Sequence, residues 1–318
     1  MHVRLLLVLM LVITTQSWGQ SLPPHISQYR VSFGSITRNR QTLLILRRFE
    51  LNGKPYYLLV DSQTLQTTIA PDQPTSPTVL TLADLLTFQV TSPYSQALLA
   101  AASNAKPLQD AGFTHTLPRE KGITLTIDLC PSHKPLDRVI FTSLAQELGK
   151  YESPVPLALS ITGVWMKQHP DDLAWLKQLA NKGILSITWI NHSFHHHVST
   201  TEPLDRNFLL EPGTDLNDEV LLTEQAMLTN GLIPSVFFRF PGLISDQNLV
   251  NRIGQYGLIT VGSDAWLAKG QTPGWGSIVL IHGNGNEPVG VEDFLKLLRQ
   301  HQADIANRQW LLYDLRRE

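Results

Sequence analysis

Cysteine is almost absent from this chain of 318 residues: Cys130 is the only one, which excludes an internal disulfide. Charge is also scarce, since Asp, Glu, Lys and Arg make up 16% of the residues and the formal net charge is -2. The chain therefore has neither a basic field nor an acidic tail, and we expect no nucleic-acid partner. Hydrophobic residues make up 42%, enough to bury a substantial core, and the length suggests about two domains.

The N-terminus has a short basic segment at 1–4 and an apolar run at 5–15 that is too short to span a bilayer comfortably. Residues 17–19 are typical of a signal-peptidase site, with Gln20 as the first mature residue. We predict a cleaved secretory signal at 1–19, export to the periplasm or the extracellular space, and no membrane span in the mature chain. An uncleaved anchor would need a longer apolar stretch. Export without disulfides favours a bacterial envelope over a eukaryotic secretory route.

Alternating apolar residues between 28 and 70 predict β-strands, and Asn52 followed by Gly53 between two such runs is a strong hairpin signal. Helix-like segments follow, without an accompanying set of reactive side chains. We predict that residues 20–120 form a small β-rich accessory domain of mixed structure and unassigned role.

From about Gly122 onward, a strand, a loop and a helix follow one another about seven times. The expected strands read ITLTID, PLALSIT, LSITWI, SVFFRF, LITVGS, SIVLIH and WLLYDL. Such alternation predicts a parallel sheet with helices around it, most economically closed into a (β/α) barrel over residues 121–318. A doubly wound open sheet is the alternative.

A run of histidines follows the strand LSITWI, within residues 184–198. His192 and His196 are four residues apart, a spacing that suits two ligands of one metal ion, and neutral imidazole is the commonest metal ligand. His195 and His197 lie beside them. Taken alone, the run is equally compatible with a solvated, histidine-rich loop.

Polar residues also follow other predicted strands at or near their carboxyl ends, the face on which barrel active sites are built. Asp128 is a candidate general base or metal ligand, or else a turn cap, and His282 is a candidate general acid or else a hydrogen-bonded core histidine. Arg239 in an apolar strand requires a carboxylate partner. Asp264 is placed to orient a histidine, and Trp266 is either a wall of an acyl or sugar pocket or a core residue.

Five segments in this order, TIDLCPS, NHSFHH, RFPG, SDAW and IVLIH, resemble the motifs of the polysaccharide deacetylases, the NodB-homology family also called carbohydrate esterase family four. The resemblance extends from Gly122 to the C-terminus. It implies a distorted (β/α) barrel that hydrolyses N- or O-acetyl groups on a carbohydrate polymer with a divalent metal, most often Zn²⁺.

Carried over by motif, the resemblance implies a role for each matching residue. It makes Asp128 the catalytic base, His282 the acid, and His192 and His196 metal ligands. It further implies that Arg239 holds the base, Asp264 tunes the acid, Leu280 lines the acetate pocket, and the backbone N–H of Gly242 binds the oxyanion.

Two positions depart from the family pattern. Leu129 stands where the family has a second aspartate, its third metal ligand, and Cys130 follows where glycine is usual. The third motif has Gly242 where the family has an aromatic residue, so one wall of the substrate groove is expected to be missing. Candidates for the third metal ligand in this chain are His195, His197, His133 and Cys130.

Three functions are compatible with the sequence. The first is an exported, metal-dependent hydrolase that deacetylates an envelope or extracellular glycan. The second, suggested by Leu129, is a non-catalytic or weakly metal-binding glycan-binding protein on the same scaffold. The third is a hydrolase with Cys130 as its nucleophile, which would need an adjacent base to activate the thiol.

Overall fold

A computed structural model of the protein describes residues 23–38, 41–72, 78–105, 108–116 and 121–317. The predicted secretory signal lies outside these residues. None of the helices in the described ranges is long and apolar enough to cross a membrane.

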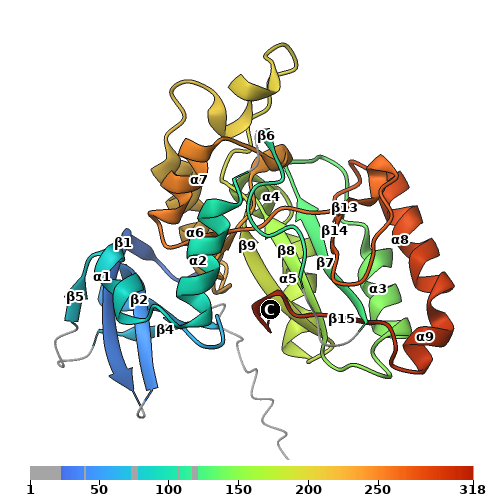
Figure 1. The fold of residues 1–318 in the computed structure, drawn as a ribbon, viewed down its shortest axis with the longest axis horizontal. Helices are drawn as coiled ribbons and strands as arrows, with labels where there is room; N and C mark the ends of the chain where they lie inside the picture. The colour runs from blue at the N-terminus through green and yellow to red at the C-terminus, as the bar shows by residue number, and fades with distance from the viewer. Residues whose placement is uncertain (1–22, 39–40, 73–77, 106–107, 117–120, 318) are drawn as a thin grey trace, which may run out of the picture.

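The N-terminal part is an antiparallel sheet in the order β4-β3-β2-β1-β5, followed by two helices (Figure 1). The predicted hairpin is confirmed: Leu51 pairs with Lys54, and Asn52 and Gly53 between them both have positive φ, as a type I′ turn requires. Helix α1 begins with a capping box between Thr81 and Asp84. The elements are β1 (Ile26–Arg38), β2 (Gln41–Leu51), β3 (Lys54–Asp61), β4 (Thr67–Pro71), β5 (Thr78–Leu80), α1 (Leu82–Phe88) and α2 (Pro93–Ser103).

The rest of the chain is built on a parallel sheet in the order β12-β10-β9-β8-β7-β14-β13. The last long strand, β14, pairs with the first, β7, so the strands follow one another around a barrel in chain order. This confirms the distorted barrel and excludes the doubly wound alternative. Among the described residues the one seam lies between β12 and β13. The strands are β7 (Gly122–Leu129), β8 (Val155–Ile161), β9 (Leu185–Asn191), β10 (Phe237–Phe238), β12 (Ile259–Thr260), β13 (Ala265–Trp266), β14 (Ile278–His282) and β15 (Leu311–Leu312), which pairs with the start of β7.

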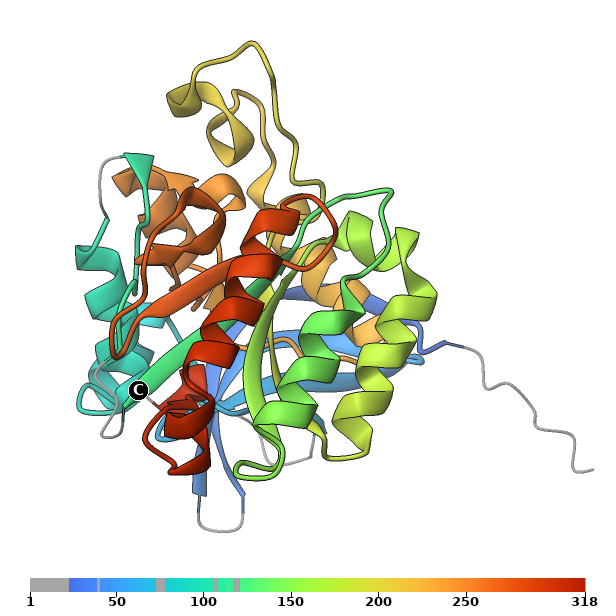
Figure 2. The same ribbon diagram turned by 90° about the vertical axis from the view of Figure 1, so that its right-hand side faces the viewer.

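Helices cover the outside of this barrel, and α3, α5 and α8 lie next to one another on one side (Figure 2). Strands β7 and β8 are buried along their whole length, as expected for a sheet covered on both faces. The helices are α3 (Arg138–Glu147), α4 (Gly163–Gln168), α5 (Pro170–Asn181), α6 (Leu216–Thr229), α7 (Gln247–Gly254), α8 (Pro288–Gln300) and α9 (Gln302–Ala306). Short elements complete the chain: β6 (Leu108–Gln109), β11 (Ile244–Ser245), η1 (Leu204–Arg206), η2 (Phe208–Leu210), η3 (Pro241–Leu243), η4 (Leu267–Lys269) and η5 (Leu315–Arg317).

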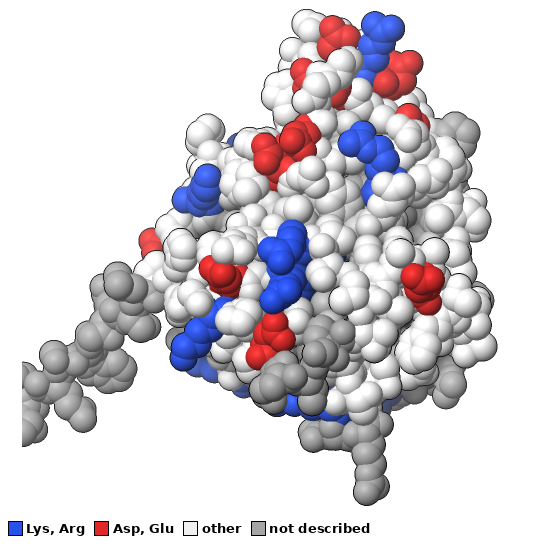
Figure 3. All heavy atoms as spheres, turned by 90° about the vertical axis from the view of Figure 1, so that its left-hand side faces the viewer, with Lys and Arg blue, Asp and Glu red and all other residues white. Residues whose placement is uncertain are grey.

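The N-terminal sheet shares a hydrophobic core with the barrel. Side chains of β2, β3 and α2 pack with residues of β9, β10 and β12 in one buried cluster. On the side of the molecule that carries this sheet, charged side chains are sparse and of both signs (Figure 3). The main contributors to the shared core include Leu44, Leu46, Val60, Tyr94, Ile190, Phe237 and Ile259.

A buried ion pair also joins the two parts. Arg47 of β2 donates from Nε and Nη2 to the two carboxylate oxygens of Glu224 in α6, at 2.7 and 2.9 Å, and both side chains are fully buried. The Tyr29 hydroxyl donates to the same carboxylate at 2.8 Å. A buried charge is costly without its partner, so this pair fixes how the sheet meets α6.

We predict that Glu224→Gln lowers the free energy of unfolding by about 3–5 kcal/mol, because it leaves the Arg47 guanidinium buried without a counter-charge. Denaturant titration of the purified protein measures this change. The matched control is Asp72→Asn, which removes the partner of the exposed Arg48 and should cost no more than about 1 kcal/mol. Equal costs for the two variants would contradict this account of the interface.

Candidate active site

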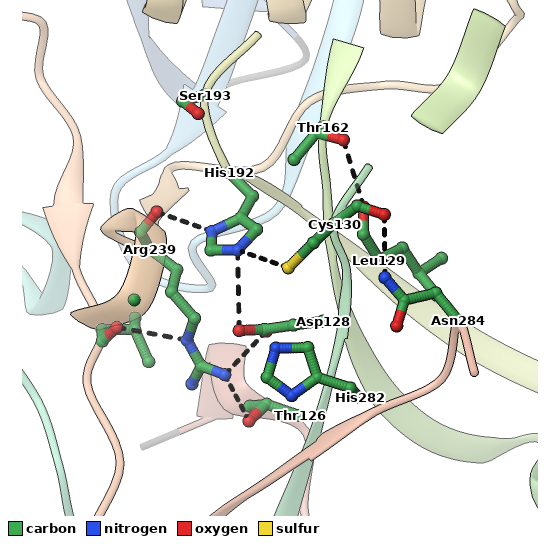
Figure 4. A network of polar contacts seen from close by, with 12 residues as sticks. Thr126, Asp128, Leu129, Cys130, Thr162, His192, Ser193, Arg239, His282 and Asn284 are labelled. Carbon is green, nitrogen blue, oxygen red and sulfur yellow. Dashed lines mark hydrogen bonds and ion pairs between the residues drawn. The ribbon is translucent and has the colours of Figure 1, made fainter. Parts of the chain in front are cut away.

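Asp128 and Arg239 form a buried ion pair at the bottom of the site (Figure 4). Asp128 lies near the end of β7 and is 3% exposed, and Arg239, directly after β10, is fully buried. Arg239 Nη1 donates to Asp128 Oδ1 at 3.0 Å and to Thr126 Oγ1 at 2.7 Å, while Nη2 donates to the carbonyl of Gly262 at 2.8 Å. The prediction that the buried arginine has a carboxylate partner is confirmed.

Burial is the largest single influence on the pKa of Asp128 and raises it, but the Arg239 guanidinium, His192 and His282 together lower it more. The net shift is downward, so the carboxylate stays ionised at neutral pH. A carboxylate that is ionised at neutral pH is thus held at this end of the barrel.

His192 follows β9 directly and is almost completely buried. Its Nδ1 lies 2.9 Å from the carbonyl oxygen of Arg239, which can only accept, so Nδ1 carries the proton in this hydrogen bond. Nε2 faces the other way, 3.5 Å from Cys130 Sγ and 3.6 Å from Asp128 Oδ2 (Figure 4). A backbone carbonyl that fixes the tautomer in this way is typical of a histidine that ligates a metal through its second nitrogen.

Cys130, His192 and His196 form a group whose candidate ligand atoms all lie within 4.8 Å of one another. Of the candidates for a third ligand, Cys130 is therefore the one that the structure brings to the two histidines. Asn284 Nδ2 donates to the backbone carbonyl of Cys130 at 2.8 Å and holds this turn in place. Leu129 points the opposite way, into the hydrophobic core, because successive side chains of a strand alternate.

Two observations indicate that Cys130, His192 and His196 are suited to hold a metal ion. Nε2 of His196 is buried without a hydrogen-bond partner among the described residues, although a buried polar atom normally has one. One thiolate and two imidazoles are also a donor set that suits Zn²⁺, with a position left for water or substrate. Burial raises the pKa of Cys130, but His196, His282 and His192 lower it more strongly, which favours the thiolate that a metal requires.

The remaining histidines have other partners or surroundings. His195 Nδ1 pairs with Glu219 at 2.8 Å, and His197 Nδ1 pairs with Glu211 at 2.5 Å. Both rings are more than half exposed, and His133 is exposed as well. These three were candidates for the third ligand and are not part of the group. Glu219, which no sequence motif singles out, also accepts hydrogen bonds from the backbone N–H groups of Phe194 and His195 and so shapes the histidine loop.

His282 is the last residue of β14 and pairs in register with Asp128, so both lie at the same end of the barrel. Its Nδ1 lies 2.8 Å from Glu287 Oε2, and the same oxygen accepts a hydrogen bond from Trp266 Nε1 at 2.8 Å. Burial lowers the pKa of His282, but Cys130, Glu287 and Asp128 raise it more. Trp266 is thus part of the site, with its ring 5.7 Å from that of His282.

The prediction that Asp264 tunes His282 is wrong. Asp264 Oδ1 accepts a hydrogen bond from the backbone of Ile278 at 3.0 Å, and Oδ2 pairs with His115 at 2.6 Å. Ile278 begins β14 and His282 ends it, so Asp264 lies about 13 Å along the strand from His282, at about 3.3 Å per residue. Glu287, just before α8, is the carboxylate that contacts His282.

The other predicted substrate residues are close to this mouth. Leu280 is buried in β14, in register with Thr126 and Trp266. Gly242 lies three residues after Arg239 in η3, with a φ of 61°. A Cβ atom there would meet the ring of Phe208 at 2.6 Å, and the left-handed φ also favours glycine at this position.

We predict that Glu287→Ala lowers kcat by about 10- to 100-fold with little change in KM, because His282 loses the group that fixes its ring and directs Nε2 into the site. Steady-state kinetics on an acetylated glycan, the substrate class that the sequence motifs imply, measures both parameters. Glu287→Gln, which keeps an acceptor oxygen, should recover part of the loss. Glu292→Ala, on the exposed side of α8, is the matched control, and an equal effect of Glu292→Ala and Glu287→Ala would contradict the assignment.

Comparisons with known proteins give two kinds of match. The family model of the RP012 protein N-terminal domain matches residues 27–84, which cover the N-terminal sheet. Among solved structures, the chain is similar to a family 4 carbohydrate esterase from Bacillus anthracis, with 20% identity and a TM-score of 0.46 over 70% of this chain and 89% of that one.

Two further structures illustrate the range of these matches. The family 4 carbohydrate esterase PdaA of Bacillus subtilis has 18% identity and a TM-score of 0.44, over 64% of this chain and 82% of that one. BA3943 of Bacillus anthracis, described as a CE4 family pseudoenzyme, has 17% identity and a TM-score of 0.41, over 61% of this chain and 66% of that one. Family 4 carbohydrate esterases are the family that the five sequence motifs resemble.

Proposed function

We propose that this protein is an exported, metal-dependent hydrolase that removes N- or O-linked acetyl groups from an envelope or extracellular glycan. The observation that carries the proposal is the convergence of an ionised carboxylate, a partly buried histidine and a cysteine–histidine group at one end of the barrel. Asp128, His282 and the group of Cys130, His192 and His196 come from β7, β9, β14 and the turns that follow them. The order of the five motifs supports the same function.

Cys130, His192 and His196 are the residues that would hold the metal, and Zn²⁺ is the ion that suits them best. When bound, such an ion polarises the acetyl carbonyl and lowers the pKa of a water molecule. Arg239 contributes by fixing His192 through its backbone and Asp128 through its guanidinium.

Asp128 is the base in this proposal: it takes a proton from the attacking water as the new C–O bond forms. The backbone N–H of Gly242 is the proposed donor to the developing oxyanion. His282 then donates a proton from Nε2 to the leaving nitrogen or oxygen as its bond to the acetyl carbon breaks, because Nδ1 is held by Glu287. Leu280 and Trp266 are the proposed lining of the acetyl and sugar positions.

We further propose that residues 20–120 act as an accessory domain fixed to a catalytic domain at 121–318, and that residues 1–19 direct export. The shared core and the Arg47–Glu224 pair support a rigid connection between the two parts.

The test is release of acetate from a panel of N-acetylated chito-oligosaccharides, peptidoglycan and O-acetylated exopolysaccharide, with Zn²⁺ supplied. We expect acetate from at least one of them and loss of the activity on chelation. Absence of acetate from the whole panel, with the metal bound, would overturn the proposal. Binding of the same glycans that is unaffected by chelation would instead favour the non-catalytic alternative, which Leu129 suggests.

A further inference from the structure

Phe208 lies beside the candidate metal ligands on a segment that the proposed reaction does not use. This segment, residues 199–215, is the later part of the connection between β9 and α6 and extends above the barrel (Figures 1 and 2, yellow). The Phe208 ring is half-buried and meets the ring of His196 edge-on, with centroids 5.7 Å apart. An apolar face therefore borders the site at one of the proposed metal ligands.

The same ring occupies the space above Gly242. A Cβ atom on Gly242 would lie 2.6 and 2.7 Å from Cζ and Cε2 of Phe208, closer than such atoms can approach. Gly242 also adopts a positive φ. The side chain that is missing at position 242 is thus replaced, in space, by an aromatic ring that comes from a distant part of the chain.

Asn207 holds Phe208 in this place. The Asn207 side chain is 3% exposed, and its oxygen accepts hydrogen bonds from the backbone N–H groups of Ser199 and Phe208, both at 2.9 Å. Its nitrogen donates to the carbonyls of Ser199 at 2.7 Å and Glu202 at 3.2 Å, so the amide uses all its donors and acceptors. Phe208 itself has a φ of 54°, which is strained for a bulky residue and persists only where the surroundings enforce it.

We propose that Phe208 forms the apolar wall of the substrate groove, against which the face of an acetylated sugar ring packs, and that it determines how tightly the glycan is held beside His196. The inference rests on the proposed function. Aromatic walls with a few placed polar groups are the usual lining of ligand sites, and a rigid ring offers a large contact area at small entropic cost. Residues 199–215 then act as a specificity element of this chain.

The test compares two substrates on the zinc-loaded protein: tri-N-acetylchitotriose, and ethyl acetate, which has no sugar ring. For Phe208→Ala we expect KM for the oligosaccharide to rise about tenfold, since an aromatic contact contributes about as much as a tenfold change in affinity. Any change in kcat/KM for ethyl acetate, or in bound zinc, should be smaller than this rise in the oligosaccharide KM, because ethyl acetate has no sugar ring to contact Phe208. Phe208→Leu keeps apolar volume but not the flat ring, so its KM for the oligosaccharide should lie between those of the wild-type protein and Phe208→Ala. This variant tests the proposal if the alanine variant does not fold.

Leu204→Ala is the matched control, because Leu204 is 48% exposed on the same segment and should leave KM unchanged. Unchanged oligosaccharide KM in both Phe208 variants, in a wild-type protein that deacetylates chitotriose, would overturn this inference alone. If the wild-type protein releases no acetate, calorimetric titration with chitotriose replaces KM: weaker binding by Phe208→Ala supports the wall, and equal binding overturns it. A wild-type protein that neither binds nor deacetylates any glycan of the panel would overturn the inference together with the proposed function.

Discussion

Asp128→Asn is expected to lower the rate of acetate release by about 10²–10⁴-fold, the usual contribution of a general base. The amide keeps the size of the carboxylate and an oxygen that can accept from Arg239, but it cannot take a proton from water. Bound zinc should remain near the wild-type level, because Asp128 is not one of the three proposed ligands. Single-turnover acetate release and elemental analysis of the same preparations measure both quantities.

Asp264→Asn is the matched control for this experiment. From the sequence, Asp264 was as plausible a site residue as Asp128. In the structure, however, its carboxylate pairs with His115 and accepts a hydrogen bond from the backbone N–H of Ile278. Its variant should retain activity within about twofold, as for a position outside the site. A loss that is equal in Asp264→Asn and Asp128→Asn would contradict the geometry, and full activity in Asp128→Asn would show that Asp128 is not the base.

Cys130→Ser is expected to weaken zinc binding by at least about 100-fold, more than the 10- to 100-fold typical of losing an outer-shell partner. A serine hydroxyl is a poor substitute for a thiolate, so activity at low zinc should fall in parallel and return in part when zinc is raised. A competitive titration with a chromogenic chelator measures the affinity.

Cys130→Asp distinguishes a ligand from a nucleophile. An aspartate can ligate zinc but cannot replace a thiolate in covalent catalysis, so it should retain more zinc and more activity than Cys130→Ser. Equal, complete and zinc-independent loss of activity in both variants would instead support Cys130 as the nucleophile.

The barrel and the central part of the site were predictable from local patterns. The strand–helix alternation predicts the parallel sheet, and the placement of Asp128, His192 and His282 directly after or at the end of strands predicts that they meet. The Arg239–Asp128 pair follows from the cost of burying a guanidinium alone. Each of these inferences needs only a strand, its direction and the residue at its end.

Other features depend on distances between elements that the sequence does not encode locally. Asp264 was misassigned because β12 and β13 contain two residues each, so the apparent strand before it ends well short of His282. Glu287 directly precedes α8, and Phe208 lies in the long segment before α6. No periodic pattern in the sequence indicates that either side chain reaches the site. The choice of Cys130 over the other candidate ligands likewise required knowing that Leu129 faces the core.

The most direct test of a metal-dependent deacetylase is acetate release from a responsive glycan as zinc is added back to chelated protein. We predict no release from the zinc-free protein, a linear rise with added zinc, and saturation at one zinc per chain that Cys130→Ser fails to reproduce. Acetate release that is independent of zinc, or zinc bound in full at Cys130, His192 and His196 without acetate from any glycan, would contradict this prediction.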